Sequence, residues 1–230
     1  VRIGTVPSKN IVKTYIENGY YHIYNRGIEK RKIFLDDQDC KIFLNYIKLY
    51  LSPIEELKSQ NQVGFRLYRF IPLNLSSEVE LMAFALMPNH IHLLVKQNTK
   101  DGIIKFMRRV ATSYVMYFNK KYDRVGSLFQ NRYKGALIES ESYLLHLSRY
   151  IHLNPVKLNP QNVNFRDFSS YPYYLNQKEA SWVKPSEIVN YFQSAQMKNP
   201  KEMFSYKSFV EDYSEEPTII LGDLTLEDEG

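Results

Sequence analysis

Alternation of apolar and polar positions with a period of two predicts the strands of this chain. Residues 20–26 (YYHIYNR) are aromatic and β-branched and end at a glycine, so they are typical of a first strand. Residues 79–87 become apolar on both faces toward their end, as expected of a central strand. A Pro-Asn turn at 88–89 joins them to residues 90–95 (HIHLLV) as an antiparallel hairpin, and residues 135–138 are predicted to form a last strand.

Apolar residues at helical spacing predict the helices that connect and follow these strands. The acidic run at 36–39 would cap a helix that stops near Pro53, with an inner side made by Phe43, Leu44, Ile47 and Leu51. Residues 101–121 are predicted to form a long amphipathic helix, with a buried stripe of Ile103, Met107, Val110, Ala111, Tyr114 and Phe118. A further helix would begin near Ser140 and turn inward Leu144, Leu147 and Ile151. It should end at about Asn154, because Pro155 cannot continue a helix.

The order strand–helix–strand–strand–helix–strand predicts an α+β fold of the ferredoxin-like split βαβ type. It would have an antiparallel sheet with helices on one face, plus a C-terminal helical extension. We expect an N-terminal arm (1–19), a main domain (20–158) with an insertion at 53–78 that includes a strand or hairpin near 65–71, and a C-terminal extension (159–230). The extension would hold helices near 185–193 and 200–213 and end in an acidic tail.

The overall composition is that of an ordinary soluble globular protein, with 44% apolar and 24% charged residues among 230. The single cysteine, Cys40, excludes an internal disulfide and suits a reducing cytoplasm. No apolar run approaches membrane-spanning length, and residues 1–10 lack the apolar core of a signal peptide. These features predict an intracellular, cytoplasmic protein without a membrane partner.

The charge is spread unevenly along the chain. Residues 211–230 hold eight of the 25 acidic groups and no Lys or Arg, which leaves residues 1–210 with 30 basic against 17 acidic groups, a net charge of +13. So large a positive charge over residues 1–210 indicates a polyanionic partner such as nucleic acid, although charge that serves only solubility is an open alternative. The 19 tyrosines and 13 phenylalanines add surface on which unpaired bases can stack, although most of them will be core.

His90 and His92 are the first candidate site residues. On a strand they share one face, with backbones roughly 7 Å apart, so both imidazoles can reach one metal ion. An incidental His-x-His pair is the alternative reading. On the helix that begins near Ser140, Tyr150 and Asn154 lie one turn apart on one face, which sets a nucleophile beside a metal ligand. A packing tyrosine and a helix-terminal asparagine remain the ordinary alternatives, and Tyr143 is a rival nucleophile two turns earlier.

Two motifs together carry a family resemblance: MPNHIHLLV at 87–95 and YIHLNPVK at 150–157. The sequence resembles the single-tyrosine HUH transposases, and among them the REP-associated tyrosine transposases of bacteria. The segments YHIYNRG at 21–27, LFQNRYKG at 128–135 and FSSYPYY at 168–174 agree with this. The resemblance covers about residues 20–175, except most of 53–78.

The resemblance implies a metal-dependent enzyme that nicks and joins single-stranded DNA beside hairpins through a 5′-phosphotyrosine. It implies that His90, His92 and Asn154 bind Mg²⁺ or Mn²⁺ and that Tyr150 attacks the DNA, although imidazole ligands by themselves favour softer ions. Arg26, Arg132 and Lys134 would contact DNA. Further basic side chains are expected to follow the DNA backbone, namely Arg31, Lys32, Arg108 and Arg109.

Two other classes of function remain open from the sequence. The chain could be a non-catalytic DNA-hairpin-binding regulator on the same fold, or a metal-dependent hydrolase in which Tyr150 is merely structural. We expect the protein to be nucleoid-associated. The sequence leaves open whether it acts as a monomer or as a homodimer.

Overall fold

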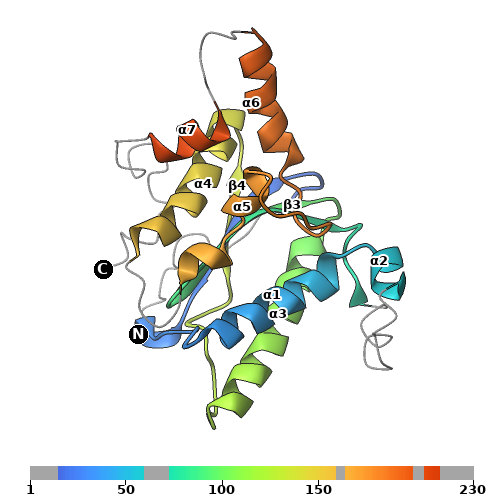
Figure 1. The fold of residues 1–230 in the computed structure, drawn as a ribbon. Coiled ribbons are helices and arrows are strands. Elements are labelled where there is room, and N and C mark those ends of the chain that lie inside the picture. The colour runs from blue at the N-terminus through green and yellow to red at the C-terminus, as the bar shows by residue number, and fades with distance from the viewer. Residues whose placement is uncertain (1–14, 60–72, 159–163, 199–204, 213–230) are drawn as a thin grey trace, which may run out of the picture.

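A four-stranded antiparallel sheet forms the centre of the computed structural model, which describes residues 15–59, 73–158, 164–198 and 205–212. The strands are β1 (Tyr20–Arg26), β2 (Val79–Met87), β3 (His90–Gln97) and β4 (Lys134–Ile138), and their order across the sheet is β2-β3-β1-β4. Helices α1 (Asp37–Leu51) and α3 (Gly102–Lys121) lie side by side on one face of this sheet (Figure 1). The predicted ferredoxin-like α+β fold is confirmed.

Several predicted caps and stops fix where the elements begin and end. The Asp36 side chain accepts a hydrogen bond from the backbone N–H of Asp39 at 2.9 Å, so it caps α1 as expected. Helix α1 ends at Leu51, two residues before Pro53. Ser140 caps α4 (Glu141–Leu153) in the same way, because its side chain accepts from the backbone N–H of Tyr143. Helix α4 then passes into a short 3₁₀ turn over Asn154–Lys157.

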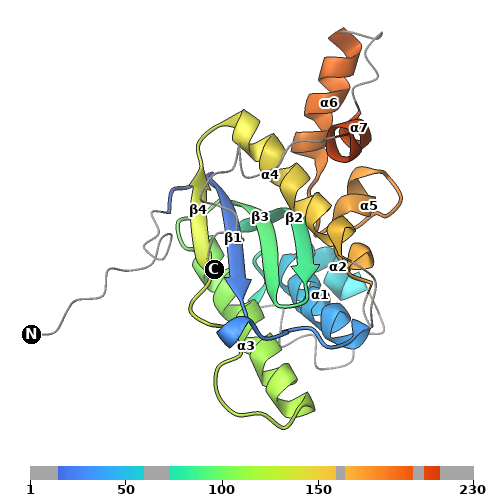
Figure 2. The ribbon, with the colours of Figure 1, turned by 90° about the vertical axis from the view of Figure 1, so that its left-hand side faces the viewer.

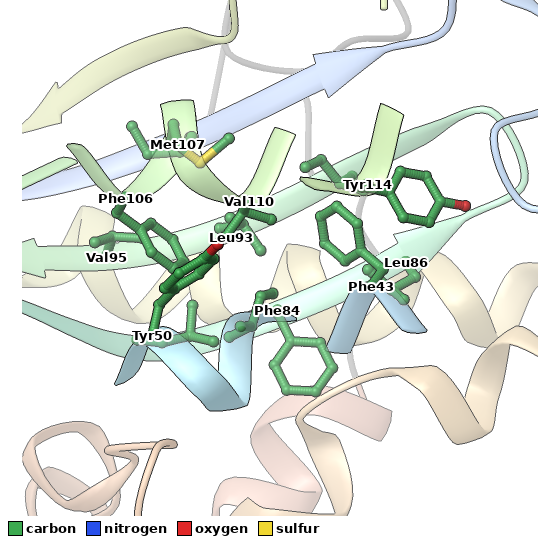
Figure 3. Packing of buried hydrophobic residues seen from close by; sticks show 14 of the residues in the cluster. Phe43, Tyr50, Phe84, Leu86, Leu93, Val95, Phe106, Met107, Val110 and Tyr114 are labelled. Carbon is green, nitrogen blue, oxygen red and sulfur yellow. The ribbon is translucent and has the colours of Figure 1, made fainter. Parts of the chain in front are cut away.

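The larger core lies between the sheet and the helix pair α1 and α3. Figure 3 shows aromatic rings from both helices meeting the sheet, and Phe43 of α1 packs edge-on against Tyr114 of α3 with ring centroids 5.1 Å apart. Burying each such ring contributes about 1.5–3 kcal/mol. The predicted stripe of α3 is buried, with Ala111 half-buried at its margin. This layer therefore holds the larger share of the buried apolar side chains.

Helix α4 packs against the opposite face of the sheet, where it contacts β2 and β3 (Figure 2). A β-bulge between Leu81 and Ala83 shifts the register of β2 against β3. As a result Met82 and Ala83 both belong to the core under α4, whereas their neighbours Leu81 and Phe84 belong to the core under α1 and α3. Strand β2 is an edge strand of the sheet, not the central strand that its apolar sequence predicts. It is apolar on both faces because α1 and α3 pack on one side of it and α4 on the other.

The C-terminal part packs against α4 through three further helices. These are α5 (Tyr171–Tyr174), α6 (Ser186–Lys198) and α7 (Tyr206–Glu211), and the last two fall where the sequence predicts helices. The Tyr206 hydroxyl of α7 lies 2.7 Å from Nδ1 of His152 and 3.1 Å from the Ser148 hydroxyl, both on α4. The guanidinium of Arg149 sits 4.4 Å from the centroid of the Phe209 ring. Helix α7 thus holds the outer side of α4.

One helix differs from the sequence prediction, and three predicted segments lie wholly or mostly outside the described residues. A short helix that was not predicted, α2 (Ile54–Ser59), occupies the start of the expected insertion. The strand or hairpin expected near 65–71, most of the N-terminal arm and the acidic tail at 213–230 lie outside the described residues. Among the helices that the structure describes, none has the length and apolar character needed to cross a bilayer.

Candidate active site

The strand pairing places His90 and His92 on the face of the sheet that α4 covers. In β3 they alternate with Ile91, which points into the core under α1 and α3. The centroids of the two imidazole rings are 4.9 Å apart. The antiparallel register sets Tyr24 of β1 opposite His92 and Arg26 opposite His90, so these side chains share the same face.

The turn that precedes the two histidines is held by the segment after β1. The backbone N–H of Gly27 donates to the carbonyl of Asn89, and that of Ile33 donates to the carbonyl of Pro88, both at 2.8 Å. The side-chain oxygen of Asn89 lies 2.6 Å from Nδ1 of His90. The start of β3, and with it the His90 ring, is therefore held by the segment after β1 and by Asn89 of the turn itself.

A third histidine, His22 of β1, belongs to this cluster and was missed by the sequence reading. Its Nε2 lies 2.9 Å from Nδ1 of His92, and the two rings stack with centroids 5.1 Å apart. Both side chains are fully buried. Alternation along β1 sets His22 on the same side as Tyr24, and the pairing of β1 with β3 brings it to His92.

Tyr150 reaches the histidines from α4. Its ring stands nearly perpendicular to the His92 ring, with centroids 5.3 Å apart, and it lies 6.4 Å from the His22 ring. The side chain is only 3% exposed. Asn154 follows one helical turn later, its backbone N–H donates to the Tyr150 carbonyl, and its side chain is buried. The structure therefore brings the expected phenol and imidazoles together within one chain.

The histidines of this cluster are neutral at physiological pH. Burial, followed by the effect of nearby His90, lowers the pKa of His22 to about 3. Burial, followed by the positive charge of Arg26, likewise lowers the pKa of His90 to about 3. The pKa of His92 falls well below its ordinary value for the same main reason. Neutral imidazoles keep a nitrogen lone pair that can bind a cation.

The donor set fits a divalent cation in its chemistry. Nε2 of His92 and Nδ2 of Asn154 are buried side-chain atoms with no hydrogen-bond partner in the described part of the chain. Such orphaned polar atoms are costly unless a ligand satisfies them, and rotation of the Asn154 amide by 180° would present its oxygen instead. Within the described residues, no group of three or more His, Cys, Asp or Glu side chains is arranged to hold a metal ion. A cation here would need the Asn154 amide, or oxygens of a bound phosphate, to complete its coordination.

The predicted DNA-contacting residues separate into two groups. Arg26 and Lys134 lie with the histidines, and Nζ of Lys134 is 5.8 Å from the centroid of the Tyr24 ring. The other five lie elsewhere, namely Arg31, Lys32, Arg108, Arg109 and Arg132. Arg31 is paired with Glu29 in the loop after β1, and Lys32 beside it is exposed. Arg109 donates to the Leu73 backbone carbonyl, which gives it a contact within the fold.

The remaining histidines and the rival tyrosine of α4 have other surroundings. His152 is fully buried, with Nδ1 bonded to Tyr206 and Nε2 2.6 Å from the Ser170 hydroxyl, so its role is structural. Nδ1 of His146 accepts a hydrogen bond from the Arg149 guanidinium, and the His146 ring lies near the ring of Phe209. Tyr143 is half-buried, and burial, together with nearby Tyr24 and Tyr150, raises its pKa. Of the two tyrosines, Tyr150 is the more deeply buried and has its ring against His92.

Comparisons with known proteins give one family match and two similar solved structures. The family model described as "Transposase IS200 like" matches residues 60–154, a range that includes His90, His92, Tyr150 and Asn154. No curated protein matches the sequence. One similar solved structure is a REP-associated tyrosine transposase bound to a REP hairpin, at 15% identity and a TM-score of 0.47, with 76% of this chain and 97% of that chain covered. Another is a protein from Deinococcus radiodurans R1 provisionally described as a transposase, at 16% identity and a TM-score of 0.35, with 61% and 93% covered.

Proposed function

We propose, from the match of residues 60–154 to the IS200-like transposase family model, that this chain belongs to that family and that it cuts and rejoins single-stranded DNA beside a hairpin. Tyr150 is the proposed nucleophile. The observation that carries this proposal is the Tyr150 ring standing 5.3 Å from the ring of His92, whose Nε2 is buried and finds no partner among the described residues. A phenol beside an imidazole nitrogen that could bind a cation gives a nucleophile next to a group that could help to activate a phosphate.

In the proposed reaction the Tyr150 oxygen attacks the phosphorus of a phosphodiester. The bond from phosphorus to the 3′-oxygen breaks, the 5′-phosphate stays on the tyrosine, and the 3′-oxygen takes a proton from water while the phenolic proton passes to water. The new ester keeps the energy of the broken bond, so a second 3′-hydroxyl can attack it and join the strands. That reversal distinguishes a strand-transferase from a hydrolase.

His90, His92 and Asn154 are the proposed ligands of a divalent cation, Mg²⁺ or Mn²⁺. When bound, the ion would polarise the phosphate and offset the negative charge that develops on its oxygens. His22 is proposed to position His92. If Nδ1 of His92 donates to Nε2 of His22, the lone pair of His92 is left on Nε2, the nitrogen without a partner.

The basic residues beside the histidines have a separate proposed role. A free phenol has a pKa of about 10, so the tyrosine needs nearby positive charge to ionise. Arg26 and Lys134 lie on this face and can hold the phosphates on either side of the one under attack. Because Tyr150 lies over the histidines of its own chain, the geometry supports a site completed by one protomer.

The test is covalent trapping on DNA. Wild-type protein is incubated with labelled hairpin-flanked single-stranded DNA and Mn²⁺ and run on a denaturing gel. We expect a protein–DNA adduct that disappears in Tyr150→Phe and persists in the matched variant Tyr143→Phe, with thermal unfolding used to verify that both variants fold. An adduct that survives Tyr150→Phe rejects the assigned nucleophile. Cleaved DNA without any adduct would indicate a hydrolase, and binding alone would indicate a regulator.

A further inference from the structure

We infer that a pocket on the far side of the sheet from His90 and His92 binds unpaired nucleotides of the same DNA strand. This inference rests on the proposed function, since it extends the path of that strand beyond the reacting phosphate. The pocket lies between α3 and the segment that leads into β4, and its volume is about 870 Å³. Asn25 of β1 lines it, and Asn25 alternates with Tyr24 and Arg26, which face the histidines.

The lining of the pocket suits nucleotides in both its apolar and its charged parts. Buried Met107 and half-buried Val115 of α3 form an apolar floor. Exposed Arg108 and Arg132 stand at its edge, and none of the described residues that line it carries a carboxylate. Bases can lie on apolar and aromatic surfaces while arginines bind the phosphates between them. Single-stranded DNA, with flat bases and acidic phosphodiester linkages, therefore matches this pocket.

Two tyrosines line the pocket without adding negative charge. The hydroxyls of Tyr15 and Tyr133 are 2.7 Å apart. Burial raises the pKa of both phenols, and in Tyr15 the hydrogen bond with Tyr133 raises it further. Both side chains are partly buried, line the pocket and stay neutral at physiological pH, so they add aromatic surface to it without charge.

The start of β4 connects this pocket to the candidate active site. Lys134 faces the histidine side, with Nζ 5.8 Å from the Tyr24 ring, whereas Arg132, two residues earlier, lines the pocket. Strand β4 is an edge strand of the sheet. A DNA strand can pass around this edge from Lys134 to Arg132 without crossing a hydrogen-bonded strand. This path explains why Arg108 and Arg132 are basic although they lie away from Tyr150.

The inference is tested with two hairpin DNAs, using full-length Tyr150→Phe protein so that only binding is measured. One DNA ends close to the cleavage site, and the other carries about eight more unpaired nucleotides on each side. We expect the extended DNA to bind at least about tenfold more tightly in fluorescence anisotropy, since each stacked base adds severalfold to affinity. Replacing Arg108 or Arg132 by alanine should remove most of that ratio. Ala111→Trp, which fills the pocket, should do the same.

Lys120→Ala is the matched control, because Lys120 is an exposed cation on the same helix that does not line the pocket. It should keep the ratio of affinities. The inference is overturned if extension adds no affinity, or if Lys120→Ala lowers the ratio as much as Arg108→Ala. These outcomes are independent of the trapping experiment, because a wild-type protein that forms no adduct could still prefer extended DNA.

Discussion

His22 and His92 face each other across the β1–β3 pair, with Nε2 of the first 2.9 Å from Nδ1 of the second and both rings excluded from solvent. Two neutral imidazoles in this arrangement share one proton, so the tautomer of one ring determines that of the other. The pair therefore controls whether His92 presents a lone pair or an N–H at its second nitrogen.

Replacing His22 by phenylalanine should weaken the binding of Mn²⁺ about 10–100-fold, because the ring volume is kept while the acceptor for His92 is lost. Binding can be followed by electron paramagnetic resonance of the free ion, without DNA. His22→Gln, which retains an acceptor, should recover part of the affinity. If a folded His22→Phe protein binds Mn²⁺ as the wild type does, His22 has no positioning role.

Lys134→Ala should weaken DNA binding and make it less sensitive to salt. Loss of one phosphate contact reduces the slope of log K against log salt by about 0.7–0.9. Anisotropy titrations across a range of salt concentrations measure this slope. Lys58→Ala, at an exposed cation on α2, should leave the slope unchanged. An unchanged slope in Lys134→Ala would mean that Lys134 does not touch the DNA backbone.

The stability of the layer formed by α1 and α3 should depend on pH through the carboxylate of Asp36. Its carboxylate caps α1 and is 2.7 Å from Nζ of Lys121. Partial burial pushes the pKa of Asp36 upward, but the hydrogen bonds from Lys121 and from the Asp39 backbone outweigh this, so the pKa is lowered overall. An unfolded aspartate has a pKa of about 3.9, so this stabilisation is complete above about pH 4 and is lost as the pH falls through the folded value.

Asp36→Asn should therefore be less stable than wild type at pH 7, by no more than about 1 kcal/mol because the carboxylate is half exposed. The difference should shrink as the pH falls through the lowered folded pKa of Asp36, because the protonated carboxyl, like the amide, is uncharged. Urea unfolding at pH 7 and at acidic pH measures it. An equal difference at both values would show that the charge of Asp36 does not matter.

Most helices and strands could be predicted from the sequence because periodicity, capping residues and prolines are local signals. Strand β1 and strand β2 have the predicted bounds, and Ser140 and Pro155 bracket α4 as expected. Helix α2 was missed because it is short and mostly polar, so its packing rather than its pattern stabilises it.

The site could be predicted only where its residues carry a motif. His90, His92 and Tyr150 meet as expected, whereas His22 joins them through strand pairing, which a single sequence does not reveal. The basic face of α3 illustrates the same limit. Arg108 and Arg109 are neighbours in sequence, yet Arg108 lines a pocket and Arg109 binds the backbone at Leu73.

The contact between α7 and α4 has a consequence for how the protein is made. Tyr206 supplies hydrogen bonds to His152 and Ser148 on the helix that carries Tyr150, and it comes more than fifty residues after that tyrosine in the chain. During translation, the histidine strand and α4 leave the ribosome before the segment that secures α4 has been synthesised. A nascent chain that stops short of Tyr206 therefore contains every proposed catalytic group but lacks the contacts that hold the tyrosine helix in place.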